Sequence, residues 1–290
     1  MDYIIHLIIL INIYVILTTS TNLMMGMVNL LSLGQAAFYG IGAYLSVLAL
    51  IVFQFSFIPA LLFTMIGTGL ISMLIAYPSI RLKGDYFVLA TLGFQLIVFS
   101  ILYNWVSVTR GPYGIPGIPS PRLFGNIEIH GLWQFLILST VLAGIVIFLF
   151  YHLIHSPFGR ALKGIRDDEL SMKALGKNVT ALKIQSFAIS SAFIAIAGFL
   201  YASYIQYVDP TSFNLDESIF ILSALIVGGL GNVRGPIIGA LFVILLPEAL
   251  RFTGLPDSVA ANLQQIIYGL ALIILMRYRP QGIAGNYAIK

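Results

Sequence analysis

The residues whose types could do chemistry gather in or beside one charged segment in the middle of the chain. Asp167, Asp168 and Glu169 are neighbouring carboxylates, the groups that serve in general acid–base catalysis. His152 and His155 are three residues apart, so two imidazoles on one helix face could share a metal ion. No further ligand stands at a suggestive spacing, and lysines and arginines surround the three acids. We therefore expect helix caps and ion pairs here, not a catalytic or metal site.

Motifs that the sequence lacks narrow its function. The chain has no cysteine, which excludes disulfides and thiolate metal sites. It contains no G-x-x-x-x-G-K-[ST] phosphate-binding loop and no G-x-S-x-G nucleophile motif. We expect no catalytic residue, metal or cofactor in this chain. The net charge of +4 suits loops on the cytoplasmic side of a membrane, so it does not indicate nucleic acid as a partner.

Amide side chains are candidate functional groups inside the apolar stretches. Polar groups within a membrane are costly and usually face the interior of a helix bundle. Uncharged amides can bond a passing solute briefly without trapping a charge, which suits a zwitterion with an apolar side chain but equally urea or a small polyol. The amides concerned are Gln35, Gln95, Asn104, Gln185, Asn232 and Gln264.

Two similar segments lie 197 residues apart. LGQAAFYGIGA (33–43) aligns with LGNVRGPIIGA (230–240), with Gln35 opposite Asn232. Each copy places glycine-rich backbone and one amide before an apolar helix. Free backbone groups at membrane depth are tolerated where they are buried in protein or line a cavity, and paired interrupted helices indicate a transport pathway. We predict that Gly34, Gln35, Gln95, Gly231 and Asn232 line this pathway. Alternatively, the glycines only allow close helix packing.

Composition defines the elements that must hold these residues. The chain is 59% hydrophobic and 9% charged, with a mean hydropathy of +0.97, whereas soluble domains carry roughly a quarter charged residues. Apolar runs of the ~20 residues that cross a bilayer recur throughout. We predict an all-α polytopic transmembrane bundle with interrupted helices, forming one domain over residues 1–290. The expected spans are 4–22, 28–53, 58–79, 86–104, 132–154, 181–205, 217–230, 236–250 and 261–277.

Charge predicts the orientation. Arg81 and Lys83, the 155–183 segment, and Arg277 with Arg279 carry the clustered positive charge, so they are expected on the cytoplasmic side. Because successive spans cross the membrane in alternate directions, we then expect three parts of the chain outside: the 105–131 loop, the acidic 206–217 loop and the N-terminus. On this threading no ionisable residue lies deep in any span.

The charged segment itself, about 156–178, predicts two short helices. Ser156-Pro157 is an N-cap followed by proline at the first helical position. Asp167 and Asp168 can cap a second helix, ELSMKAL, which Gly176 would close. A short amphipathic helix outside the membrane suits docking into a groove of another protein. The alternative is a solvated loop that only obeys the positive-inside rule.

Six blocks along the chain resemble one family in content and order. SPFGRALKGIRDDELSMKALGKNV resembles the cytoplasmic coupling loop of ABC-importer permeases, in the version found in LivM-type permeases of branched-chain amino-acid importers. Gln95 stands where that family often has a carboxylate, and Arg110 where it often has glycine. The other blocks are LLSLGQAAFYGIGAY (30–44), RLKGDYFVLATLGF (81–94), GPYGIPGIP (111–119), GGLGNVRGPIIGA (228–240) and YRPQGIAG (278–285).

The resemblance implies a multi-pass permease subunit in the bacterial inner (plasma) membrane, for leucine, isoleucine and valine. Its implied partners are a homologous LivH-like second permease, two cytoplasmic ATPase subunits that bind ATP and Mg, an external substrate-binding protein and membrane lipid. A permease for urea or another small solute and an ion-coupled secondary transporter are the alternatives. The residues implied to couple to the ATPase are Arg160, Asp168, Glu169, Ala174, Leu175 and Gly176.

Overall fold

The computed structural model describes residues 2–82, 84–123, 127–129 and 131–251, together with 263, 266–267, 269–270, 273–274, 277–278 and 281–285. Most of the predicted last span, 261–277, lies outside the described residues.

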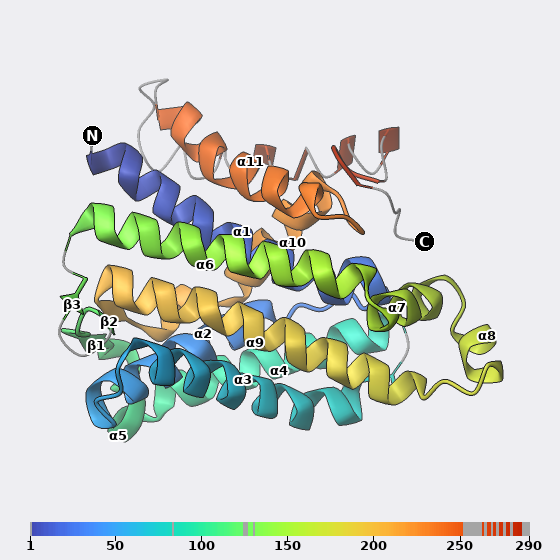
Figure 1. The fold of residues 1–290 in the computed structure, drawn as a ribbon, viewed down its shortest axis with the longest axis horizontal. Coiled ribbons are helices and arrows are strands. Elements are labelled where there is room, and N and C mark those ends of the chain that lie inside the picture. The colour runs from blue at the N-terminus through green and yellow to red at the C-terminus, as the bar shows by residue number, and fades with distance from the viewer. Residues whose placement is uncertain are drawn as a thin grey trace.

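Long, nearly parallel helices form the body of the molecule (Figure 1). Within the described residues, six helical stretches are long and apolar enough to cross a membrane, which confirms the predicted polytopic bundle. They are α1 (Asp2–Val28), α2 with a π-helical turn η1 (Gln35–Val47 and Leu48–Val52), α3 (Phe57–Ser79), α4 (Asp85–Asn104), α6 (Leu132–His155) and α9 (Val179–Ile205).

Helices α2 and α9 form the centre of the bundle. They are mostly buried, whereas α3 and α4 expose most of their apolar surface, as helices facing lipid do. The two central helices approach closely because small residues meet between them: a Cβ on Gly42 would lie 2.6 Å from Cα of Ala195, and one on Gly198 would lie 2.6 Å from the backbone nitrogen of Ala43. Packing therefore accounts for Gly42 of the first repeat, as the alternative proposed.

Both repeat segments interrupt helices, as predicted. Residues 29–34 are non-helical between α1 and α2, so the expected span 28–53 is wrong at its start: its helix begins only at Gln35. Residues 229–233 likewise separate α10 (Leu215–Gly228) from α11 (Arg234–Arg251). At about 1.5 Å per residue, the 14 residues of α10 cover only part of a bilayer core about 30 Å thick.

The two ends of the bundle carry different structures (Figure 1). One end holds the N-terminus and the short elements of the 105–131 segment; the other holds α7 (Pro157–Asp167) and α8 (Glu169–Ala174). This agrees with the predicted threading, in which these two groups lie on opposite sides. The short elements are α5 (Val106–Thr109), η2 (Gly111–Tyr113), β1 (Ile115–Pro116), β2 (Arg122–Leu123) and β3 (Ile127–Glu128); β1 pairs antiparallel with β4 (Tyr207–Val208), and β2 with β3.

The acidic 206–217 segment does not stay outside. After β4 it enters the bundle through the 3₁₀ turn η3 (Pro210–Phe213), and Phe213 is 1% exposed against the rings of Tyr39 and Tyr201. The turn can be buried because the Asp209 carboxylate accepts hydrogen bonds from Thr211 and Ser212, which satisfies its polar groups locally. The prediction that this whole segment forms an external loop is therefore wrong for its second half.

Candidate coupling helix and translocation pathway

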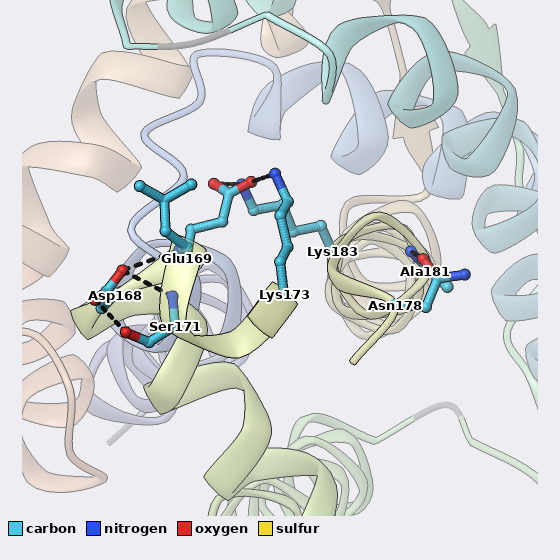
Figure 2. A network of polar contacts seen from close by, with 8 residues as sticks. Asp168, Glu169, Ser171, Lys173, Asn178, Ala181 and Lys183 are labelled. Atoms are coloured by element: carbon cyan, nitrogen blue, oxygen red, sulfur yellow. Dashed lines mark hydrogen bonds and ion pairs between the residues drawn. The ribbon is translucent and has the colours of Figure 1, made fainter. Parts of the chain in front are cut away.

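The charged segment folds as two capped helices. Ser156 accepts a hydrogen bond from the Gly159 amide at 3.2 Å and starts α7. Asp168 caps α8 by accepting from the Leu170 and Ser171 amides at 2.9 and 3.1 Å (Figure 2). Hydrogen bonds from Ser171 lower the pKa of Asp168, so it is a carboxylate at neutral pH. The predicted caps are confirmed at Ser156 and Asp168.

Gly176 closes α8 as predicted. Its φ of +73° is left-handed, its amide bonds to the Lys173 carbonyl, and the Lys177 amide bonds to the Met172 carbonyl. These two bonds are those of a Schellman motif, in which glycine tolerates the left-handed position. Since both ends of α8 are capped by the segment's own residues, this short helix keeps its shape without a partner.

Glu169 ties α8 to the bundle. Its carboxylate oxygens pair with Lys173 at 2.8 Å and with Lys183 of α9 at 2.7 Å (Figure 2). Burial acts to raise the pKa of Glu169, but hydrogen bonds from the two lysines outweigh it and hold the pKa below its ordinary value. Lys183 is largely buried, so this pair fixes the angle at which α8 leaves the bundle.

The outer face of α8 is apolar and uncovered. Leu170 and Leu175 are 75% and 72% exposed. Met172 points the other way: it packs against the core, and a Cβ on Gly164 would lie 2.6 Å from its sulfur. The helix thus anchors one side on α7 and presents two leucines beside charged groups, an arrangement suited to docking into a groove.

The two arginines of α7 reach different places. Arg160, one of the predicted coupling residues, donates to the carbonyl of His155, the last residue of α6, at 3.0 Å. Arg166 pairs through Nε with the neighbouring Asp167 at 2.9 Å and donates through Nη1 to the carbonyl of Gly26, near the end of α1, at 3.0 Å. Sequence reasoning noted Arg166 only as positive charge; its partner lies 140 residues away, so no local pattern identifies the contact.

Gln95, a predicted pathway residue, caps the interrupted helix α2 from outside. Its Oε1 accepts from the Ala37 amide at 2.5 Å, and its Nε2 donates to the Phe213 carbonyl at 2.8 Å. Ser218 of α10 accepts from the Ala36 amide at 2.9 Å. Side chains of α4 and α10 therefore satisfy the free amides with which α2 begins.

The paired amides of the two repeats differ in their contacts. Asn232 accepts from the Gly235 amide at 2.7 Å, which caps α11, and donates to the Ala284 carbonyl. Gln35 is 1% exposed, and neither polar atom of its amide has a hydrogen-bond partner among the described residues. Asn22 of α1, which sequence reasoning missed, bonds the Gly231 amide at 3.1 Å and the Asn232 carbonyl at 2.7 Å. That Gly34, Gln35, Gln95, Gly231 and Asn232 line a pathway stays a prediction.

Glu217 corrects the expectation that no ionisable residue lies deep in a span. Tyr14, near the middle of α1, donates from its hydroxyl to Glu217 Oε1 at 2.7 Å. The next residue, Ser218, caps α2 beside Gln95, which lies near the middle of α4. Glu217 therefore sits at about mid-depth. The sequence did not identify Glu217 as a buried residue, because the acidic residues of 206–217 predicted a solvent-exposed loop.

The histidines form no metal site with other residues in the part of the chain that the structure describes. His155 bonds the carbonyl of Tyr151 on its own helix, and His152 stacks on Phe148. No group of three potential ligands gathers among the described residues.

Comparison with known proteins agrees with this architecture. The family described as "Branched-chain amino acid transport system / permease component" matches residues 3–276. The "High-affinity branched-chain amino acid transport system permease protein LivM" of Salmonella typhimurium and that of Escherichia coli K12 are each 32% identical to this chain, over 93% of it and 67% of the relative. The "Probable branched-chain amino acid transport permease protein LivH" of Methanocaldococcus jannaschii is 25% identical over 94% of this chain and 89% of the relative. No solved structure matches the chain.

These likenesses cover nearly the whole helical bundle, including α8 and both interrupted helices. The chain belongs to the permease family of branched-chain amino acid transport systems.

Proposed function

We propose that the chain is a pathway-forming subunit of a binding-protein-dependent ABC importer for branched-chain amino acids. The observation that carries this proposal is α8. It is capped at both ends, held to α9 by the Glu169–Lys183 pair, and presents Leu170 and Leu175 outside the bundle. A capped helix that exposes leucines at one end of a membrane bundle is suited to contact with a partner, and the match to LivM-type relatives supports an ATPase as that partner.

The partners follow from the same proposal. Two cytoplasmic ATPase subunits bind ATP and Mg and push α8, so this chain hydrolyses nothing and holds no cofactor. The likeness to a LivH-type relative supports pairing with a homologous second permease. A substrate-binding protein docks at the opposite end of the bundle. A cavity of about 680 Å³ opens there between residues 47–55 and the 107–122 segment. Its concave surface is suited to docking of the binding protein.

The test is reconstitution of the chain with its genomic partners in vesicles. Uptake of labelled leucine that requires ATP and the binding protein is the expected result. Uptake of urea in its place, with leucine excluded, would assign the chain to the small-solute alternative.

Glu217 at mid-depth gives one specific reason to test an ion-coupled transporter as well, since such carriers use intramembrane carboxylates. In the same vesicles, uptake that runs on an imposed ion gradient without ATP would support that alternative. Uptake that collapses without ATP and ignores the gradient excludes it.

A further inference from the structure

A cavity of about 420 Å³ lies where α1, α10 and α11 meet, and Glu217 lines it. Its size falls within the ~300–1,000 Å³ of typical small-molecule pockets. Helices α2 and α9 and the turn η3 contribute Tyr39, Tyr201 and Ser212 to its wall, so five helices and a turn enclose it. None of the predicted pathway residues lines this cavity.

The carboxylate of Glu217 has no cationic partner among the residues that the structure describes. Tyr14 donates a hydrogen bond to it at 2.7 Å, but no lysine, arginine or histidine among the described residues forms an ion pair with it. Glu248 of α11 lines the same cavity and adds a second carboxylate to it. An acidic group at membrane depth is costly unless paired, so a positively charged group beside Glu217 would be stabilised.

Support of its own helix does not account for the position of Glu217. Acidic residues in the first turn stabilise a helix, and Asp216, which is exposed, is placed to do so. Asn214 already caps α10 by accepting from the Glu217 amide at 3.1 Å. The Glu217 carboxylate instead crosses to Tyr14 on α1, at the wall of the cavity.

The rest of the lining suits a cation that carries an apolar group. Tyr14, Tyr39, Tyr201 and Phe220 bring aromatic rings, whose faces attract ammonium groups. Aliphatic side chains form the remaining wall and offer an apolar surface. They are Leu7, Leu10, Ile13, Val243 and Ile244.

We infer that this cavity binds a small solute with a primary ammonium group and an aliphatic side chain, with the ammonium at Glu217. The inference rests on the proposed function, and it places a substrate site in this chain away from the amides of the two repeats.

Photo-crosslinking tests the inference in the reconstituted complete importer. The probe is photo-leucine, the diazirine analogue of leucine, and mass spectrometry locates its adducts on this chain. Adducts are expected on residues 7–14 or 243–248. Glu217→Gln should reduce them at least tenfold, whereas the control Asp216→Asn, one residue away on an exposed side chain, should leave them unchanged. The glutamine keeps an acceptor for the Tyr14 hydroxyl, and size-exclusion chromatography checks that the complex assembles.

Competitors define the chemistry of the site. Isoamylamine, an ammonium without a carboxylate, should suppress the adducts, whereas 4-methylpentanoate, a carboxylate without an ammonium, should not. Equal suppression by both, or unchanged adducts in Glu217→Gln, overturns the inference. A Glu217→Gln importer that keeps its adducts and loses only its response to a pH gradient also overturns the inference, because the carboxylate would then bind a proton and not the solute.

Leucine uptake by the wild-type complex separates this inference from the proposed function. Leucine uptake without adducts in the cavity contradicts the inference alone. Amine-sensitive adducts in a complex that imports no leucine support the site and contradict the proposed function.

Discussion

Arg166 of α7 donates a hydrogen bond to the backbone carbonyl of Gly26, two residues before α1 ends. The last carbonyls of a helix lack partners within it, and a cation there also complements the helix dipole. A Cβ on Gly26 would lie 2.7 Å from the Gly231 nitrogen, so the same turn of α1 touches the interruption before α11. Movement of the charged segment can therefore reach both interrupted helices through one arginine.

Arg166→Ala should uncouple ATP hydrolysis from transport. The substitution also removes the pair with the exposed Asp167, but exposed ion pairs contribute little. The lost bond to Gly26 comes from a charged donor, a class worth about 1.5–3 kcal/mol, so leucine imported per ATP hydrolysed should fall about tenfold or more. The matched control is Lys163→Ala, which removes another positive charge of α7 but leaves the Gly26 contact in place. Both activities are measured in the same vesicles. An equal loss in the two variants would show that charge on α7 matters and the Gly26 contact does not.

Gly176→Pro should abolish coupling while Gly176→Ala retains it. Proline removes the amide that bonds the Lys173 carbonyl and fixes φ near −65°, whereas the position requires +73°. Alanine keeps the amide and meets no atom within 4 Å, so only the left-handed backbone costs it about 1–2 kcal/mol. ATP-dependent uptake and co-purification of the ATPase are the measurements. Normal uptake by a stably expressed proline variant would refute the role of α8.

The attachment of α8 should weaken in acid. The pKa of Glu169 is lower in the folded protein than its ordinary 4.5, so its ion pairs are fully formed above that value and are lost as the pH falls through the lowered pKa. A spin label at Leu175→Cys should therefore become more mobile as the pH falls through this lowered pKa. In Glu169→Gln the label should be mobile at every pH. A label with the same pH response in both proteins would mean that Glu169 does not hold α8.

Local sequence patterns predicted the structural features whose contacts are formed by residues close together in the sequence. Ser156, Asp168 and Gly176 cap helices through residues at most five positions away, so the pattern of types was sufficient. Glycine-rich backbone before apolar runs likewise predicted the two interruptions, although Gly42 of the first repeat serves helix packing instead.

Contacts between distant segments could not be read in this way. Gln95 looks like an isolated amide in an apolar helix, yet it joins residues 58 and 118 positions away. Glu217 belongs to an acidic stretch that suggests water, and only the return of η3 into the bundle places it opposite Tyr14. Such positions depend on how the helices pack, which no single segment encodes.

Cysteine labelling should fix the orientation of the bundle. The chain has no native cysteine, and Tyr113 and Leu175 are 80% and 72% exposed. Tyr113 lies between α5 and β1 and Leu175 directly follows α8, and these elements stand at opposite ends of the bundle. With the positive segment inside, an impermeant thiol reagent added to intact cells should label Tyr113→Cys and not Leu175→Cys. Permeabilised cells, in which both react, are the control. The reverse pattern would overturn the orientation and the site of ATPase docking with it.

Gln35→Leu and Asn232→Leu should have different effects, although the two amides occupy equivalent places in the repeats. Asn232→Leu removes the cap of α11, a change that costs about 0.5–2 kcal/mol, so it should lower the thermal midpoint of the complex and reduce hydrolysis and uptake together. Gln35 leaves two buried polar atoms without a partner among the described residues, so Gln35→Leu should not lower stability.

If Gln35 faces the pathway, as predicted, its leucine variant should import leucine more slowly while ATP hydrolysis stimulated by the binding protein continues. Thermal midpoint, hydrolysis and uptake are measured on the same three preparations, with the wild-type complex as reference. Unchanged uptake in Gln35→Leu would remove this residue from the pathway. A parallel fall of all three quantities, the result expected for Asn232→Leu, would assign Gln35 to packing.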